Sequence, residues 1–286
     1  MTFFFKSYFW IVLFVAFFLG GIILIENNEQ ERTRTQVLAM AQNKVELVDK
    51  ILQLKGSSLE VFLSDYKSRP EILRFMVTEG KQPLRFVLEE ALPSFAVDAV
   101  WIYRRDFTLS YSANRRESSA LRSFPVTAEQ LRRLYAASDA ARHFFILTPA
   151  GLMEVRTAPI RPAADRAAAP GGYLFVGRLW TPAYLAELEE LSSASMAVVP
   201  ASAECAGQPY YDRNRGSVSF TKRLPGINAE PFKCVRVSYA VPLAGESHRT
   251  SNQQLTLMFV FAAAILIFLS GFEAFRKWLL DRNAQR

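Results

Sequence analysis

Two long apolar runs lie near the ends of the chain and enclose a middle part of mixed polarity. Residues 8–25 read YFWIVLFVAFFLGGIILI, and residues 255–272 read LTLMFVFAAAILIFLSGF, eighteen residues without a charge. A helix of about 20 apolar residues spans a bilayer. The pattern predicts two transmembrane helices, within residues 1–25 and 255–275, and a domain held at both ends by the lipid bilayer.

Charges beside the apolar runs predict the orientation of the chain in the membrane. Four basic residues lie within residues 276–286, opposed only by Glu273 and Asp281. Basic residues are enriched on the cytoplasmic side, so this tail and the N-terminus are expected to be cytoplasmic. The first run is longer than a signal peptide core and has no small-residue cleavage site before Glu26, which favours an uncleaved helix. Residues 26–254 are therefore expected to be extracytoplasmic.

Apolar residues between positions 37 and 66 recur at alternating steps of three and four, which is typical of a helical seam. They are Val37, Ala41, Val45, Val48, Leu52, Leu59, Phe62 and Tyr66. The pattern predicts a long stalk helix within residues 26–70, with Gly56-Ser57-Ser58 as its weak point and Pro70 near its end. Two alternatives remain for the seam: it packs on a second copy in a parallel homodimer, or its own domain covers it.

Residues 71–254 change to the period of strands. The predicted strands are Val97–Tyr103, Phe107–Ser112, His143–Thr148, Leu152–Ile160, Gly172–Leu179, Met196–Pro200, Ser217–Leu224 and Phe232–Leu243. Thr127 and Gln130 form a capping box for one helix, and Thr181-Pro182 begins another. Hairpins joined by short helices predict an α+β domain with an antiparallel sheet, covered on one face by the long helix.

The charge and the motifs of the middle part argue against several functions. Residues 26–254 carry 29 Lys and Arg against 25 Asp and Glu, and this small, scattered excess does not indicate a nucleic-acid partner. His143 and His248 are the only histidines, and they lack the spacing of metal ligands. The chain has no nucleophile elbow, phosphate loop or dinucleotide fingerprint. The sequence therefore predicts no enzyme, no metal and no cofactor.

The two cysteines of the chain, Cys205 and Cys234, both lie in the predicted extracytoplasmic part. An even number of cysteines in an oxidising compartment favours a disulfide over two buried thiols. Such a bond would close a loop of about 30 residues and stabilise the fold by ~3 kcal/mol in the chain-entropy model.

Alternation along the strands indicates a candidate ligand site. Trp101 and Tyr103 share one face of their strand, Glu154 and Arg156 lie together on theirs, and Arg178 follows on the next. An aromatic and arginine cluster on an open sheet face suits a small organic anion. The alternative is that Trp101 belongs to the core and the arginines are solvated.

The chain resembles the type-four CHASE sensor domains of bacterial membrane receptors. The resemblance is carried by VWIYRRDFTLSYS at 100–112, VRTAPI at 155–160 and GGYLFVGRLW at 171–180. It implies a PAS/Cache-like fold in a two-span protein of the bacterial cytoplasmic membrane, with its main domain periplasmic or extracellular. It also implies a histidine kinase or diguanylate cyclase output, fused in a longer receptor or carried by a separate protein. Asp65-Tyr66 lacks the tryptophan of a motif frequent in that family, so no family ligand is carried over.

The predicted function is the extracytoplasmic ligand- or stimulus-sensing part of a transmembrane receptor, which passes a helix displacement across the membrane. The alternative function is a membrane-anchored interaction or assembly protein, whose periplasmic docking domain binds a protein ligand and sends no signal inward.

Overall fold

A computed structural model describes residues 35–78, 84–115, 118–136, 138–165, 168–201, 205, 208–212, 215–241, 256, 259, 260 and 282. The chain divides into two compact units. One comprises Met1–Met40, Tyr211–Ser217 and Ala240–Arg286, and the other comprises Ala41–Tyr210 and Val218–Tyr239. The predicted transmembrane helices lie outside the described residues, apart from residues 256, 259 and 260. Within the described residues, no helix is long and apolar enough to cross a membrane.

The longest described helix covers residues 35–66 and is called the long helix below. The other helices and helical turns are α2 (Pro70–Thr78), η1 (Arg85–Glu89), η2 (Ser119–Leu121), α4 (Ala128–Ala136) and α5 (Pro182–Ser192). Both predicted helix starts are confirmed. The Thr127 amide donates to Gln130 Oε1 at 3.0 Å, and the Gln130 amide donates to Thr127 Oγ1 at 3.3 Å. At α5, Thr181 Oγ1 accepts from the Tyr184 amide at 3.2 Å, which satisfies a free donor of the first turn.

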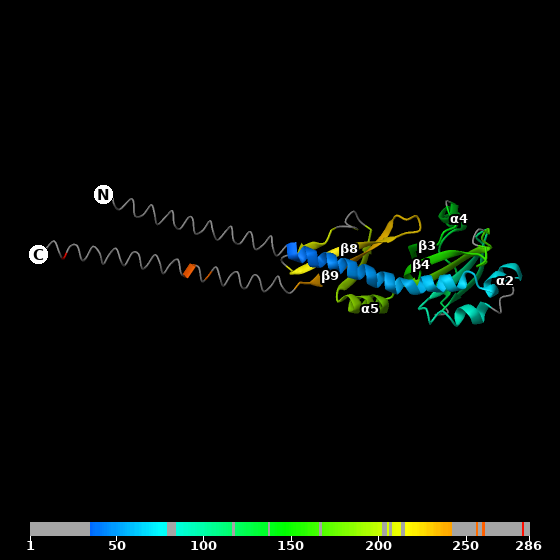
Figure 1. Cartoon of the computed structure of the whole chain (residues 1–286), viewed down its shortest axis with the longest axis horizontal. Coiled ribbons are helices and arrows are strands. Elements are labelled where there is room, and N and C mark those ends of the chain that lie inside the picture. The colour runs from blue at the N-terminus through cyan, green and yellow to red at the C-terminus, as the bar shows by residue number, and fades with distance from the viewer. Residues whose placement is uncertain are drawn as a thin grey trace. The chain divides into compact units, whose positions relative to one another are not determined.

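The strands form two antiparallel sheets, where the sequence predicted one (Figure 1). The first has the order β2-β1-β5-β4-β3, made of β1 (Ala99–Arg104), β2 (Leu109–Asn114), β3 (Arg142–Thr148), β4 (Gly151–Ile160) and β5 (Gly172–Leu179). The second has the order β6-β9-β8-β7, made of β6 (Ser195–Pro200), β7 (Tyr210–Asp212), β8 (Ser217–Pro225) and β9 (Pro231–Ala240). The α+β class is confirmed. The strand β7 was not predicted, because its three residues are too few for an alternating pattern.

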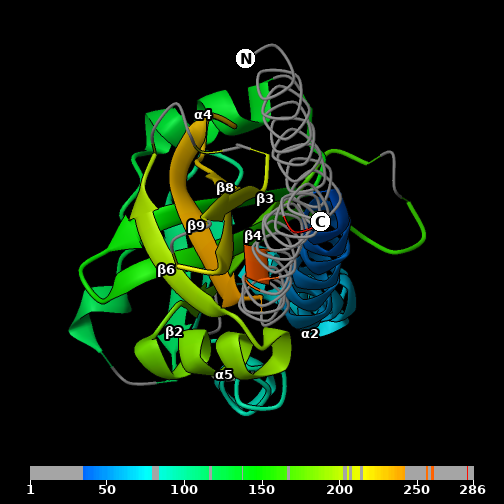
Figure 2. The same cartoon turned by 90° about the vertical axis from the view of Figure 1, so that its left-hand side faces the viewer.

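The long helix runs beside both sheets from residue 41 onward (Figures 1 and 2). Its Asp49 pairs with Lys222 of β8, and its Glu60 pairs with Arg156 of β4. Helical geometry continues without a break through Gly56, as expected for one long helix. The weak point expected at Gly56-Ser57-Ser58 stays a prediction.

The apolar seam of the long helix is covered by the chain itself, so the second of the two alternatives holds. Val48 packs with Val235 and Val237 of β9, whereas Leu59 and Phe62 pack on the five-stranded sheet. All three helix side chains are fully buried. This packing does not support a homodimer through the buried seam residues. A different set of apolar side chains is exposed on the same helix, namely Met40, Leu47, Leu54 and Val61.

Candidate functional site

The register of the five-stranded sheet separates the five predicted site residues. Trp101 pairs with Phe175 and Glu154 pairs with Arg178, and the two β5 residues are three positions apart, so they point to opposite faces. One face therefore carries Trp101 and Tyr103, and the other carries Glu154, Arg156 and Arg178. The prediction of one shared cluster is wrong. The pairing of β1 with β5 puts Trp101 on one face of the sheet, and the pairing of β4 with β5 puts Glu154 and Arg156 on the other. The ligand-binding role of each residue stays a prediction.

Arg178 is buried and joins β5 to the long helix. Its Nε donates to the carbonyl of Ala96 at 3.0 Å, and Nη2 donates to the carbonyl of Phe95 at 3.2 Å. On the long helix, Nη1 donates to the carbonyl of Lys55 and Nη2 donates to the hydroxyl of Ser58. Because four of the five guanidinium donors are occupied, Arg178 holds two segments together and has little capacity left for a ligand.

Glu154 is the buried anion at the centre of this cluster. His143 Nε2 lies 3.0 Å from Glu154 Oε1, Trp180 Nε1 donates to Oε2 at 3.4 Å, and Arg156 Nε lies 3.8 Å from Oε1. Burial by itself raises the pKa of Glu154, but the His143 hydrogen bond and the charges of His143, Arg178 and Arg156 outweigh it and lower this pKa below its ordinary value. The carboxylate is therefore ionised at neutral pH. Sequence reasoning missed the contribution of His143. The hairpin register pairs His143 with Arg156 and so places it diagonally beside Glu154 on the same face.

Gly56 lets the long helix approach this charged cluster. A Cβ atom at this position would lie 3.0 Å from Arg156 Nη2 and 3.1 Å from Glu154 Oε1, closer than ordinary van der Waals contact. Glycine lowers the intrinsic stability of the helix at this position, but it allows a close contact between the helix and the sheet. The glycine that the sequence marked as a weak point is therefore a position of close contact between the helix and β4.

Trp101 lies in a packed aromatic core on the opposite face. It is fully buried, its Nε1 donates to the carbonyl of Leu121 at 3.1 Å, and its ring centroid is 4.9 Å from that of Phe124. Tyr103 lies in the same cluster, where burial raises its pKa to about 12. Gly177 makes room for Met153 and for the indole, because a Cβ there would clash with Met153 Sδ and would lie 3.2 Å from Trp101 Cζ3. Trp101 is thus a core residue, as the alternative interpretation expected.

Polar groups on the aromatic face are paired with one another. The hydroxyls of Tyr135 and Thr157 lie 2.7 Å apart, and Tyr173 donates to Asp139 Oδ1 at 3.1 Å. Arg161 Nη2 donates to Asp139 Oδ2 at 2.8 Å. Burial and the charge of Asp139 raise the pKa of Tyr173 to about 12. None of these residues was predicted, because they come from separate segments that only the fold brings together.

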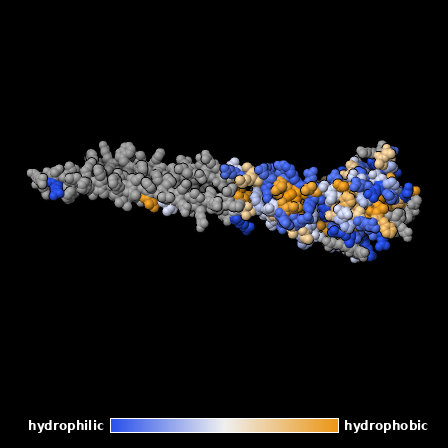
Figure 3. Space-filling view, turned by 60° about the horizontal axis from the view of Figure 1, so that its bottom comes forward, coloured by the Kyte–Doolittle hydropathy of each residue, from blue (hydrophilic) through white to orange (hydrophobic). Residues whose placement is uncertain are grey.

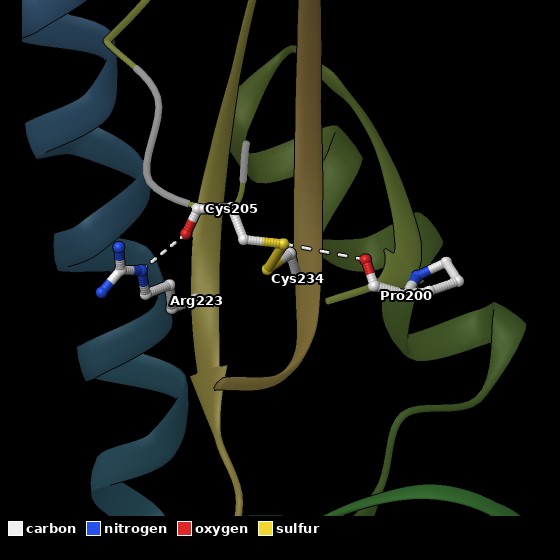
Figure 4. Close-up of a disulfide and its surroundings, with 4 residues drawn as sticks. All are labelled: Pro200, Cys205, Arg223 and Cys234. Carbon is white, nitrogen blue, oxygen red and sulfur yellow. Dashed lines mark hydrogen bonds between the residues drawn. A yellow bond between two sulfur atoms is a disulfide. The ribbon is translucent and has the colours of Figure 1, made fainter. Parts of the chain in front are cut away.

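The predicted disulfide between Cys205 and Cys234 is present, with the two Cα atoms 5.9 Å apart (Figure 4). Arg223 of β8 donates through Nε to the carbonyl of Cys205 at 2.7 Å. The bond fastens the segment after β6 to β9. In the described part of the chain, no group of three or more metal-ligating side chains comes together.

A comparison with family models assigns the chain to a known family. Residues 51–199 match the model of the CHASE4 domain. The chain belongs to the CHASE4 family. It therefore carries an extracytoplasmic sensor domain of bacterial signal transduction, as the resemblance implied. No curated protein sequence matches the chain.

Several solved structures are similar to this CHASE4 chain at low sequence identity. The Vibrio cholerae LuxQ periplasmic domain is 13% identical, with a TM-score of 0.50 over 70% of this chain and 97% of that chain. The V. cholerae histidine kinase DctB sensor domain is 10% identical, with a TM-score of 0.47 over 72% and 98%. The ligand-binding domain of the Campylobacter jejuni chemoreceptor Tlp3, solved with L-valine, is 9% identical, with a TM-score of 0.46 over 77% and 97%.

Proposed function

We propose that this CHASE4 domain senses a small organic anion and signals by moving the long helix relative to the five-stranded sheet. The observation that carries the proposal is the set of hydrogen bonds from Arg178 of β5 to Lys55 and Ser58 of the helix. Directional bonds of this kind hold one relative position of helix and sheet, and another position requires new partners. A ligand that favours a second position would therefore shift the helix.

Within this proposal, Arg156 is the ligand contact among the five predicted site residues. Its side chain is 18% exposed, whereas those of Glu154 and Arg178 are nearly inaccessible to solvent. Arg178 and Glu154 hold the helix against the sheet, and Trp101 and Tyr103 support the sheet from its other face. The ligand specificity is therefore expected to depend on the helix side of β4.

The proposal places the domain in the periplasm or outside the cell, between membrane helices at residues 8–25 and 255–275, with a kinase or cyclase output that is fused or separate. The support is the two apolar runs and the basic residues of 276–286. A phosphatase inserted at Ala168 should be active, and one fused after Arg286 should be inactive. The opposite result would exclude this topology.

A parallel homodimer remains part of the proposal, with a different contact from the buried seam. Leu47, Leu54 and Val61 are exposed at a strict spacing of seven residues, the repeat with which helices pair. Figure 3 shows one face of the molecule, on which apolar patches alternate with hydrophilic side chains. Single cysteines at these positions should form crosslinks between two copies in native membranes. A cysteine at the exposed Gln53, about 100° round the helix from Leu54, serves as the control.

Hydrogen exchange of the full chain in nanodiscs tests the helix displacement. Binding of an organic anion should change the exchange of amides in residues 41–66 and leave the aromatic face unchanged. If instead no small molecule alters this exchange, and a periplasmic protein binds the domain without altering it, the docking function is favoured.

A further inference from the structure

A cavity of about 310 Å³ lies between the long helix and the first sheet, beside Arg156. The helix contributes Glu60, Leu63 and Ser64, and Lys67 follows in the turn directly after it, at a spacing that continues the same face. Arg156 on β4 forms part of the opposite wall. The volume is at the lower end of the range of small-molecule pockets, ~300–1,000 Å³. The cavity is therefore large enough for a ligand of metabolite size.

The charges of the cavity favour an anion. Arg156 Nη1 donates to Glu60 Oε2 at 2.8 Å, and its Nε is buried without a hydrogen-bond partner in the described structure. Lys67 adds a second cation, and its ammonium forms no ion pair with the residues that the structure describes. Once the Glu60 carboxylate is matched with Arg156, the helix side of the cavity keeps an unmatched positive charge.

Glu60 occupies the position on Arg156 that an incoming carboxylate would take. The Glu60 side chain is 70% exposed and the Arg156 side chain is 18% exposed, so the glutamate can rotate into solvent while the arginine stays in the wall. Ion pairs with one exposed partner are weak and exchange readily. The pair also joins the long helix to β4. Replacement of Glu60 by another carboxylate on Arg156 would therefore remove a contact between helix and sheet.

We propose that the cavity binds a small organic anion whose carboxylate displaces Glu60 from Arg156. The apolar part of the ligand lies against Leu63 and Ala158, which are also in the wall. Lys67 strengthens binding through its charge. Glu60 is then an internal competitor that keeps the unliganded helix attached to β4. The inference rests on the proposed function as a sensor of organic anions, and it adds the site and the event that releases the helix.

Calorimetry on the full chain in nanodiscs tests the site, with propionate and isovalerate as probes and propionamide and isovaleramide as neutral controls. The carboxylates should bind and the amides should not. Glu60→Gln should tighten carboxylate binding about two- to fivefold, because an exposed ion pair competes at that level. Glu46→Gln is the matched control, since Glu46 is similarly exposed on the same helix and pairs with Lys50 at its own turn. This variant should bind as the wild type does.

Arg156→Ala should weaken carboxylate binding about tenfold or more, the value of one charge-assisted hydrogen bond. If that variant does not fold, Arg156→Lys replaces it, because lysine keeps the charge but not the planar fork and should bind less tightly than the wild type. Equal binding of acids and amides would overturn the inference. So would a Glu60→Gln affinity equal to that of Glu46→Gln, or failure of both acids to bind Glu60→Gln.

The same preparations separate the site from the proposed function. Carboxylate binding that depends on Arg156 but leaves exchange of residues 41–66 unchanged would support the site and contradict the helix displacement. Conversely, an anion that changes exchange of the helix equally in wild type and Arg156→Ala would support the displacement and overturn the site.

Discussion

The two faces of the five-stranded sheet are stabilised in different ways. The aromatic face packs Trp101, Phe124 and Phe175 against one another, and its buried hydroxyl pair, Tyr135 and Thr157, is neutral. Its ion pair, Arg161 with Asp139, is partly exposed. The helix face also has an apolar core, but one end of it buries ions around Glu154 and Arg178. Apolar contacts tolerate small shifts, whereas buried ions require specific partners. The helix face is therefore the one on which two distinct positions of the long helix would have different ionic contacts.

The difference also separates stability from signalling. A change on the aromatic face should alter how stable the domain is without changing which helix position is preferred. A change in the ionic cluster should alter both. Stability is measured on the full chain in nanodiscs, unfolded with urea and followed by near-ultraviolet circular dichroism.

Arg178→Ala should have the largest effect, lowering the free energy of unfolding by about 3–5 kcal/mol. The substitution removes one of the three cations that stabilise the buried Glu154, the others being His143 and Arg156. It also removes the bonds to the carbonyls of Phe95 and Ala96. Arg133→Ala is the control, because Arg133 is 73% exposed and its ion-pair partner among the described residues is Glu129 on its own helix. Its cost should stay within about 0.5 kcal/mol. Equal costs for the two variants would contradict a structural role for Arg178.

Gly56→Ala should destabilise the domain by up to about 2 kcal/mol. A clash with Arg156 and Glu154 costs about 1–3 kcal/mol, and the better helix propensity of alanine offsets about 1 kcal/mol of it. Amide hydrogen exchange in the long helix should also be faster in this variant, because the added methyl group pushes the helix away from β4. Gln53→Ala, at an exposed position of the same helix, should do neither. A stabilised Gly56→Ala variant would show that the close approach is unimportant.

Tyr135→Phe should cost about 1 kcal/mol, because it leaves the buried Thr157 hydroxyl without its partner. The double variant Tyr135→Phe with Thr157→Val should recover most of that loss, since both polar groups are then removed together. Hydrogen exchange of residues 41–66 should match the wild type in both. A changed helix exchange would mean that the two faces are not independent.

The smallest expected effect is on how the free energy of unfolding depends on pH, and it differs between the two faces. Glu154 has a lowered pKa in the fold, so the stability that it contributes is present above its usual value near 4.5 and is lost as pH falls through the folded pKa. Tyr103 has a pKa raised from 10.0 to about 12, so its contribution is complete below pH 10 and is lost as pH rises toward 12. Glu154→Gln should flatten the acid limb of the stability curve, and Tyr103→Phe the alkaline limb. An unchanged limb in either variant would refute the corresponding assignment.

Much of the fold was predictable because it depends on local pattern. The caps at Thr127 and Thr181 involve residues three positions apart, so the chain itself brings them together. The cysteine pair followed from its even number and its predicted compartment. Strand positions followed from alternation, which a single strand displays within five or six residues. These features need no knowledge of what packs against them.

The tertiary structure alone decided which residues share a face and what the long helix packs against. Alternation gives the two faces of one strand, but which face of β1 matches which face of β4 depends on how both pair with β5. For the same reason the sequence could not show that Trp101 and Arg156 lie on opposite faces of the sheet. Gly56 reads as a helix breaker in isolation, and only the position of Arg156 reveals it as a contact. Sequence determined the elements because their forces are local, whereas the site depends on contacts between segments more than ninety residues apart, such as Glu60 and Arg156.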